Sequence, residues 1–152
     1  MEILNDFNTS VEKALDEIDP EWREYDGLIV CGTHSTPDIK FIISRIEMAR
    51  ETGRPFLGIC HGHQLAAQEY AKNVLGQSAD DILIKLPQLK VGLHDGETYW
   101  NNYEVVEGFE DLWKKADNFI TCQFHPEYQS SKEKPHPLLV NFLNYAKAKM
   151  AV

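Results

Sequence analysis

The chain has 152 residues, of which 43% are hydrophobic and 26% charged, and these proportions are those of a folded globular domain rather than a disordered or fibrous chain. Its 24 acidic and 15 basic residues give a net charge of −9, which repels nucleic-acid phosphates and anionic membranes, so neither is an expected partner. The sequence shows no long apolar run, no signal peptide and no CxxC spacing among its three cysteines, so we expect a cytoplasmic protein with reduced thiols.

In the first half of the chain, helical patterns alternate with short, wholly apolar strands. In chain order we expect a helix opening on the capping box Thr9-Ser10-Val11-Glu12, a strand at 27–31, a helix from Pro37 to about Gly53, a strand at 55–59 and a helix at 61–75 that Gly76 stops. Buried strands that alternate with helices indicate right-handed βαβ units and a mostly parallel sheet with helices on both faces.

The second half has a more mixed pattern. We expect strands at 82–86, 89–93, 103–106 and 119–124, separated by turn residues such as Pro87 and Asp95-Gly96, and a last helix at 137–149. No linker or repeat divides the chain, so residues 1–152 are expected to form one α/β domain. In such sheets the ligand lies at the carboxyl ends of the strands, which places it near the loops after Cys31, Ile59 and Phe124.

The strongest chemical signal is the turn Gly58-Ile59-Cys60-His61-Gly62, which leads from a predicted strand into a predicted helix. Its G-x-C-x-G spacing is that of a nucleophile elbow, in which the glycines let the backbone crowd around a strained nucleophile. Cys60 would lie at a helix N-terminus, which favours the thiolate, and the His61 N–H could stabilise an oxyanion. A buried structural cysteine is the alternative for Cys60, and it is our expectation for Cys31 and Cys122, which lie in apolar strands.

The segment Phe124-His125-Pro126-Glu127 follows another predicted strand and supplies the two further groups that a thiolate needs in acyl transfer. His125 would act as base and acid, and Glu127 would orient its imidazole. Three residues alone are a weak match, but both motifs fall at carboxyl ends of strands. We therefore expect Cys60, His125 and Glu127 to form a catalytic triad.

Together, Gly58-Ile59-Cys60-His61-Gly62-His63-Gln64 and His125-Pro126-Glu127 resemble the class I glutamine amidotransferases, and among them the amidotransferase domains of CTP synthases. The resemblance extends over about residues 24–147. It implies a flavodoxin-like α/β fold, here shortened at the N-terminus to a single early strand near residues 1–4. It also implies hydrolysis of glutamine or a related carboxamide through a cysteine thioester, with no cofactor and with ammonia released to water or to a synthetase or other protein partner.

The resemblance further implies a set of substrate contacts, at Gly32, Gln64, Asn102 and Tyr103, and an oxyanion hole formed by the backbone N–H groups of Thr33 and His61. Two of these positions depart from the family. Thr33 replaces a glycine, and a positive φ there would strain a β-branched residue. Asn102 replaces an arginine that binds the glutamine carboxylate, so we expect weaker binding of free glutamine. The chain also has no GxxxxGK[ST] phosphate loop, so it would not make CTP alone.

Two other functions stay open at this stage. A non-catalytic amidotransferase-like module that binds a protein or a metabolite fits the departures at Thr33 and Asn102, whereas the intact triad favours an enzyme. A cysteine hydrolase or redox-responsive relative could use the same elbow. A metal site is not expected, because His61 and His63 at i and i+2 do not share a helix face.

Overall fold

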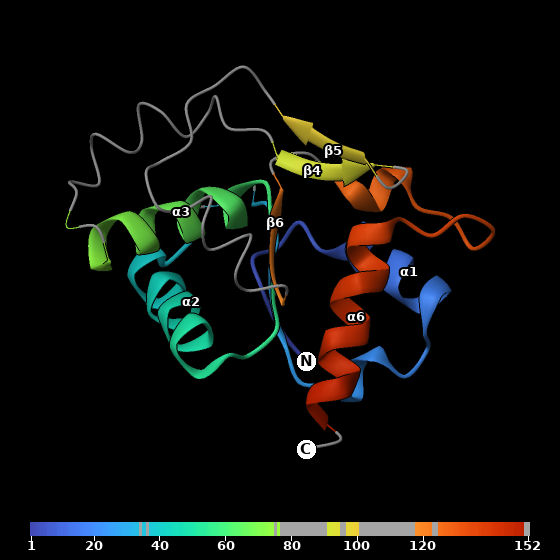
Figure 1. Cartoon of the computed structure of the whole chain (residues 1–152), viewed down its shortest axis with the longest axis horizontal. Coiled ribbons are helices and arrows are strands. Elements are labelled where there is room, and N and C mark those ends of the chain that lie inside the picture. Colours follow the sequence, from blue (N-terminus) through green and yellow to red (C-terminus); the bar gives the residue numbers. More distant parts are fainter. Residues whose placement is uncertain are drawn as a thin grey trace.

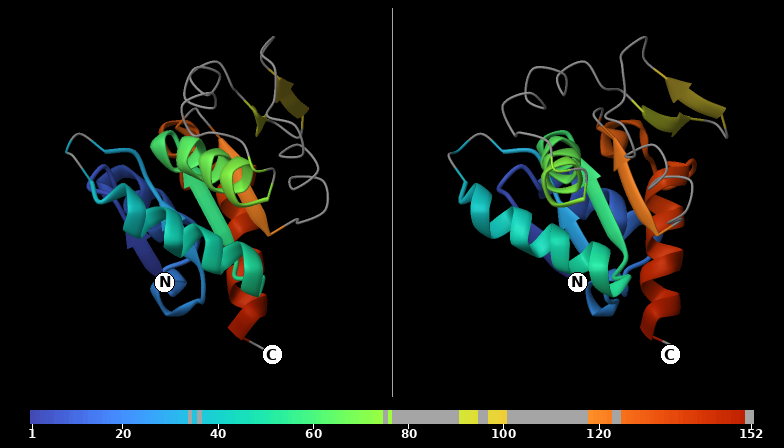
Figure 2. Two further views of the ribbon diagram at one scale, coloured as in Figure 1. Left: turned by 90° about the vertical axis from the view of Figure 1, so that its left-hand side faces the viewer. Right: turned by 60° about the vertical axis from the view of Figure 1, so that its left-hand side comes forward.

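The computed structural model describes residues 1–33, 35, 37–74, 76, 91–94, 97–100, 118–122 and 125–150. At its centre is a four-stranded sheet in the order β1-β2-β3-β6, and all three neighbouring pairs are parallel. Its strands are β1 (Glu2–Leu4), β2 (Leu28–Val30), β3 (Phe56–Ile59) and β6 (Phe119–Cys122). The carboxyl ends of the strands lie at the top of the molecule in Figure 2.

Helices cover both faces of this sheet, as the sequence predicts. Helices α1 (Thr9–Ile18) and α6 (Pro137–Met150) pack on one face, and α2 (Ile39–Thr52) and α3 (His61–Asn73) pack on the other (Figure 1). The prediction of an α/β fold with a mostly parallel sheet is therefore confirmed. Among the described helices none has both the length and the apolar composition needed to span a membrane.

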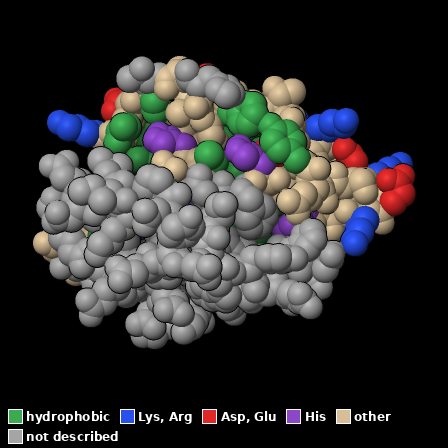
Figure 3. Space-filling model, turned by 90° about the horizontal axis from the view of Figure 1, so that it is seen from above, with side chains coloured by type: hydrophobic (Ala, Val, Ile, Leu, Met, Phe, Trp, Pro, Cys, Tyr) green, Lys and Arg blue, Asp and Glu red, His purple; other side chains and the backbone are tan. Residues whose placement is uncertain are grey.

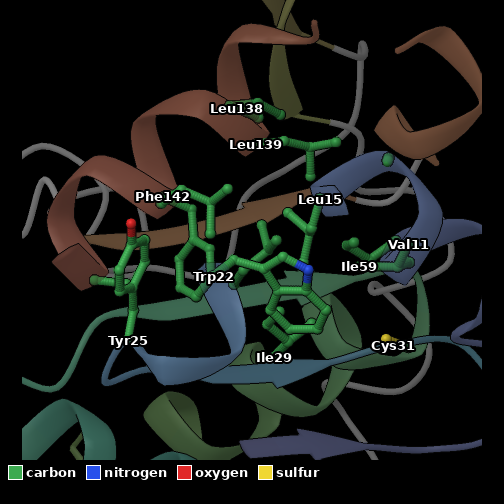
Figure 4. Close-up of a cluster of buried hydrophobic side chains, with 14 of the residues drawn as sticks. Val11, Leu15, Trp22, Tyr25, Ile29, Cys31, Ile59, Leu138, Leu139 and Phe142 are labelled. Atoms are coloured by element: carbon green, nitrogen blue, oxygen red, sulfur yellow. The ribbon is translucent and has the colours of Figure 1, made fainter. Parts of the chain in front are cut away.

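The two faces of the sheet bury separate hydrophobic cores because side chains alternate along each strand. On the α1/α6 face, Trp22 and Phe142 pack against Ile29 (Figure 4). On the α2/α3 face, Phe56 stacks on Phe119 with ring centroids 4.5 Å apart. Packing on both faces thus holds the strands in place. The residues at the strand ends are therefore well positioned to form a site.

The observed helix ends differ in detail from the predicted ones. The N-cap of α1 is Asn8, which makes no side-chain capping bond, so the predicted capping box is wrong although the helix is present. Helix α2 begins at Ile39 rather than at Pro37, because the Asp38 side chain caps it by accepting a hydrogen bond from the Phe41 N–H. It ends at Gly53, as predicted, where φ is 71°.

The second half is only partly described. Strands β4 (Val91–His94) and β5 (Glu97–Trp100) pair antiparallel in a small separate sheet. The predicted strand at 89–93 overlaps β4, whereas β5 was not predicted because Glu-Thr-Tyr-Trp contains no apolar run. The predicted strands at 82–86 and 103–106, and the turn residues Pro87 and Asp95-Gly96, lie outside the described residues. The strand predicted at 119–124 is present as β6.

The first two connections of the sheet differ in hand. The chain crosses the sheet in one direction from β1 to β3, but α1 and α2 lie on opposite faces, so the two connections have opposite hands. The chain changes direction toward the α1 face directly after β1, where Asn5 adopts a left-handed conformation with φ 78°. From there α1 buries Val11 and Leu15 in the core beside α6.

Candidate active site

Cys60 lies in the turn between β3 and α3, and its backbone is strained. Its φ of 57° falls in the region that residues with a side chain rarely adopt, and its N–H donates to the Cys122 carbonyl at 2.8 Å. The flanking glycines explain how so sharp a turn fits. A Cβ on Gly62 would lie 2.0 Å from the Val30 carbonyl oxygen, and a Cβ on Gly58 would lie 2.9 Å from the Gly62 backbone. The turn therefore has the geometry of a nucleophile elbow.

His125 and Glu127 form a hydrogen-bonded pair after β6. The imidazole Nδ1 lies 3.1 Å from Glu127 Oε2, so a proton on Nδ1 is donated to the carboxylate and Nε2 becomes the acceptor. Pro126 begins the short 3₁₀ helix Pro126–Gln129, which turns the Glu127 side chain inward until only 1% of it is exposed. The His125 side chain is 25% exposed, so the imidazole is accessible from solvent while the carboxylate that it contacts is buried.

Gly32 lies next to both the nucleophile Cys60 and the imidazole of His125. A Cβ placed on Gly32 would lie 3.6 Å from His125 Cε1 and 3.7 Å from the Cys60 Cβ. Both side chains therefore flank the same glycine at the carboxyl end of β2. This face is seen from above in Figure 3, where histidine side chains lie at the surface among hydrophobic ones.

The two backbone groups proposed for the oxyanion hole border this space. His61 is the first residue of α3, and Thr33 follows Gly32 in the chain. Among the described residues, neither backbone N–H donates to another backbone group. Thr33 is not one of the described residues with positive φ, so the strain expected for a β-branched residue does not arise. Its hydroxyl instead donates to Asp6 Oδ1 at 2.7 Å.

The structure adds three residues that the sequence analysis missed, in the loop after β1. Asn5 Nδ2 donates to the Cys31 carbonyl at 2.9 Å and lies 3.4 Å from His61 Nδ1, Asp6 accepts from Thr33, and the Phe7 ring packs on His125. The early strand near residues 1–4 was the signal that could have pointed to this loop. Because β1 pairs parallel with β2, the loop that follows it also reaches the carboxyl edge of the sheet.

The remaining proposed substrate contacts are only partly described. Gln64 is half-buried one turn into α3, and its N–H donates to the Cys60 carbonyl at 3.2 Å. Asn102 and Tyr103 lie outside the described residues.

The side chains of the two histidines of α3 lie in different surroundings, as the i, i+2 spacing implies. His63 is fully buried with Nδ1 3.0 Å from Thr121 Oγ1, and burial lowers its pKa to about 4. His61 is half-buried beside Asn5, and burial also lowers its pKa. Within the described ranges, no group of three or more His, Cys, Asp or Glu side chains is placed to hold a metal ion.

The three cysteines have different surroundings although each ends or follows a strand of the sheet. Burial raises the pKa of the Cys31 thiol to about 12, and it raises the pKa of the Cys122 thiol as well, so neither forms a thiolate readily at neutral pH. Both belong to the core shared with α1 and α6. Cys60 is less deeply buried and precedes a helix N-terminus, which favours a thiolate.

Comparisons with known proteins point to one family. Residues 4–110 match the family model described as Glutamine amidotransferase class-I. The CTP synthase of Sulfolobus acidocaldarius is 28% identical over 93% of this chain and 38% of its own length. The CTP synthase of Lactobacillus johnsonii is 28% identical over 86% of this chain and 36% of its own length. This chain thus spans less than two fifths of these two curated relatives.

A solved structure of the Trypanosoma brucei CTPS glutaminase domain with bound acivicin also resembles the chain. The two superpose with a TM-score of 0.63, covering 98% of this chain and 94% of the other, at 17% sequence identity. At that identity the likeness shows the fold. It agrees with the flavodoxin-like fold expected from the sequence.

Proposed function

We propose that this chain, which belongs to the class I glutamine amidotransferase family, hydrolyses glutamine or a related carboxamide through a thioester on Cys60. The observation that carries the proposal is that the strained Cys60 and the His125 of the His125–Glu127 pair both lie within contact distance of a Cβ placed on Gly32. Backbone strain at a non-glycine residue such as Cys60 is characteristic of functional sites, because surrounding contacts must hold it in place.

In the first half of the reaction, His125 Nε2 takes the proton of the Cys60 thiol and the sulfur attacks the amide carbon. The carbonyl oxygen becomes an oxyanion, to which the His61 and Thr33 N–H groups donate. The tetrahedral species then collapses as His125 returns the proton to the departing nitrogen, so that ammonia leaves and a thioester remains. Glu127 accepts from Nδ1 throughout and stabilises the imidazolium.

In the second half, water replaces ammonia. His125 takes a proton from the water, the hydroxide attacks the thioester carbon, and the sulfur leaves as Cys60 recovers its proton from His125. One amide and one water are thus converted into one carboxylic acid and one ammonia, which ionise according to the pH. The chain's residues supply every proton transfer, and the proposal requires no cofactor.

We propose that the ammonia is passed to a synthetase or another protein, and that residues 1–152 act as one domain in the cytoplasm. The support for the partner is that the similar proteins are CTP synthases more than twice the length of the matched segment. The support for the compartment is that the described cysteines form no disulfide.

The proposal is tested by measuring ammonia release from glutamine and from γ-glutamyl amides, for the parent and for Cys60→Ala. We expect release by the parent and a loss of at least about a thousandfold in kcat for Cys60→Ala, since the covalent step is removed. Cys122→Ala is the matched control, because its thiol lies in the core, and it should keep the activity of the parent. Equal release by Cys60→Ala would overturn the proposal. No release by the parent on any of these amides would support the non-catalytic module instead.

A further inference from the structure

The loop Asn5–Phe7, which we call the β1 loop, contacts both halves of the proposed machinery. Toward the strand that carries Gly32, the Phe7 N–H donates to the Gly32 carbonyl at 3.1 Å and Asn5 Nδ2 donates to the Cys31 carbonyl at 2.9 Å. Asp6 holds the Thr33 hydroxyl at 2.7 Å. The β1 loop therefore fixes three consecutive residues beside Cys60.

Toward the base, the Phe7 side chain packs edge-on against the His125 imidazole. The ring centroids are 5.5 Å apart and the planes are at 89°. Tyr128 lies 5.3 Å from the same imidazole at a tilt of 36°, and Phe7 lies 6.2 Å from Tyr128. The imidazole thus has an aromatic ring against its edge or face from two different elements of the fold.

The two aromatic neighbours are held unequally. Tyr128 lies on the same short 3₁₀ helix as Glu127, which His125 directly precedes, and it is 58% exposed, so it belongs to the same segment as the imidazole. Phe7 is half-buried and its own N–H donates to Gly32, the residue whose added Cβ would contact both His125 and Cys60. Phe7 is therefore the aromatic neighbour that contacts the imidazole and is also hydrogen-bonded to the residue beside the nucleophile.

We propose that Phe7 is a positioning residue that holds the His125 imidazole against Gly32, at the distance and tilt needed for proton exchange with Cys60. This inference rests on the proposed function for its catalytic consequence. The Nδ1–Glu127 hydrogen bond fixes one atom of the ring, and a ring fixed at one atom can still tilt. The Phe7 contact removes this freedom, and a misplacement of about 1 Å between reacting groups can cost about a hundredfold in rate.

The test compares Phe7→Ala with Phe7→Leu, which keeps apolar bulk against the imidazole. The matched control is Phe41→Ala, because Phe41 is 50% exposed on α2 and lies outside the proposed site. For Phe7→Ala we expect kcat to fall by about tenfold to a hundredfold while KM changes less than about twofold, because proton transfer is impaired and substrate binding is not. Phe7→Leu should recover most of the loss, and Phe41→Ala should match the parent.

A second readout needs no substrate. The Cε1–H signal of His125, assigned by its loss in His125→Gln, should shift and broaden in Phe7→Ala because a nearby ring is removed and the imidazole moves. It should stay unchanged in Phe41→Ala. An unchanged His125 signal, or equal kcat in Phe7→Ala and the parent, would overturn the proposal. If the parent releases no ammonia, the proposed function fails by itself, and the His125 signal still decides whether Phe7 holds the imidazole.

Discussion

The two ends of the parallel sheet use their polar residues in opposite ways. At the amino end, Glu2 accepts from Arg45 at 2.8 Å and from Arg54 at 2.6 Å, and Arg54 also donates to Asp26 at 2.9 Å. At the carboxyl end, Cys60 is strained and the buried Glu127 Oε1 has no hydrogen-bond partner among the described residues. Ion pairs therefore join the strands at the amino end. At the carboxyl end lie a strained backbone and a carboxylate oxygen without a hydrogen bond among the described residues.

The polar side chains at the amino end thus stabilise the sheet, whereas those at the carboxyl end belong to the proposed site. The amino-end ion pairs link β1 and α2 to the segments that lead into β2 and β3, so they hold the strands in register. The carboxyl-end groups contribute less to stability, because a strained backbone costs about 1–3 kcal/mol. Substitutions that act on these side chains should accordingly affect different measurements. A Cβ added at an elbow glycine should instead disturb the packing of β2 against α3, and the following changes test both expectations.

The largest effect is expected from Gly62→Ala, which would force a Cβ to 2.0 Å from the Val30 carbonyl oxygen. Backbone on both sides must move, so we expect the free energy of unfolding to fall by about 3 kcal/mol or more. Urea denaturation followed by circular dichroism measures this change. Unfolding at the same denaturant concentration as the parent would show that β2 and α3 are not packed as closely as described.

A smaller loss, confined to activity, is expected from Gly32→Ala. The added Cβ would make ordinary contacts of 3.5–3.7 Å with Phe7, His125 and Cys60, so the fold should persist. It would nevertheless add a methyl group against both the nucleophile and the imidazole, and we expect kcat to fall by about a hundredfold. Ammonia release and a denaturation curve are measured on the same sample. Full activity in a folded Gly32→Ala protein would contradict the site geometry.

The smallest effect is expected at the amino end, from Glu2→Gln. Hydrogen bonds from Arg45, together with those from Arg54, hold the pKa of the Glu2 carboxyl below its usual range. A lowered pKa stabilises the folded state above the unfolded pKa of about 4.3, and this contribution disappears as the pH falls through the folded value. At pH 7 we expect Glu2→Gln to cost about 1 kcal/mol with kcat unchanged.

The same experiment across pH sharpens the comparison. The difference in unfolding free energy between the parent and Glu2→Gln should be constant from about pH 6 to 8 and should shrink below about pH 4. Glu133→Gln, on the exposed loop after the 3₁₀ helix, is the control and should change neither quantity. A difference that grows on acidification would contradict the role assigned to Glu2.

The parts of the fold that could be predicted are those in which local chemistry decides the structure. The run Gly58 to Gly62 contains both glycines that the elbow requires, and Gly53 ends α2 because it can adopt a positive φ. The start of α2 was placed too early because Pro37 and Asp38 are both acceptable near a helix start, and only the bond to the Phe41 N–H distinguishes them.

The β1 loop could not be predicted because its role depends on strand order. Residues 5–7 carry no motif, and Phe7 meets His125 only because β1 lies beside β2, more than a hundred residues from the imidazole in the chain. The side of the sheet on which α1 lies could not be predicted for a related reason. Which face α1 covers depends on its packing beside α6, at the other end of the sequence.

The most direct test of the account is to treat the folded chain with a glutamine analogue that carries a chloromethyl ketone in place of the carboxamide, and to map the adduct by peptide mass spectrometry. We predict one adduct per chain, on Cys60, formed more slowly when glutamine is present. Cys31 and Cys122 should stay unmodified until the chain is denatured, since burial raises the pKa of both thiols. Modification of Cys31 or Cys122 in the folded protein, or no modification of Cys60, would contradict the assignment of Cys60 as the nucleophile.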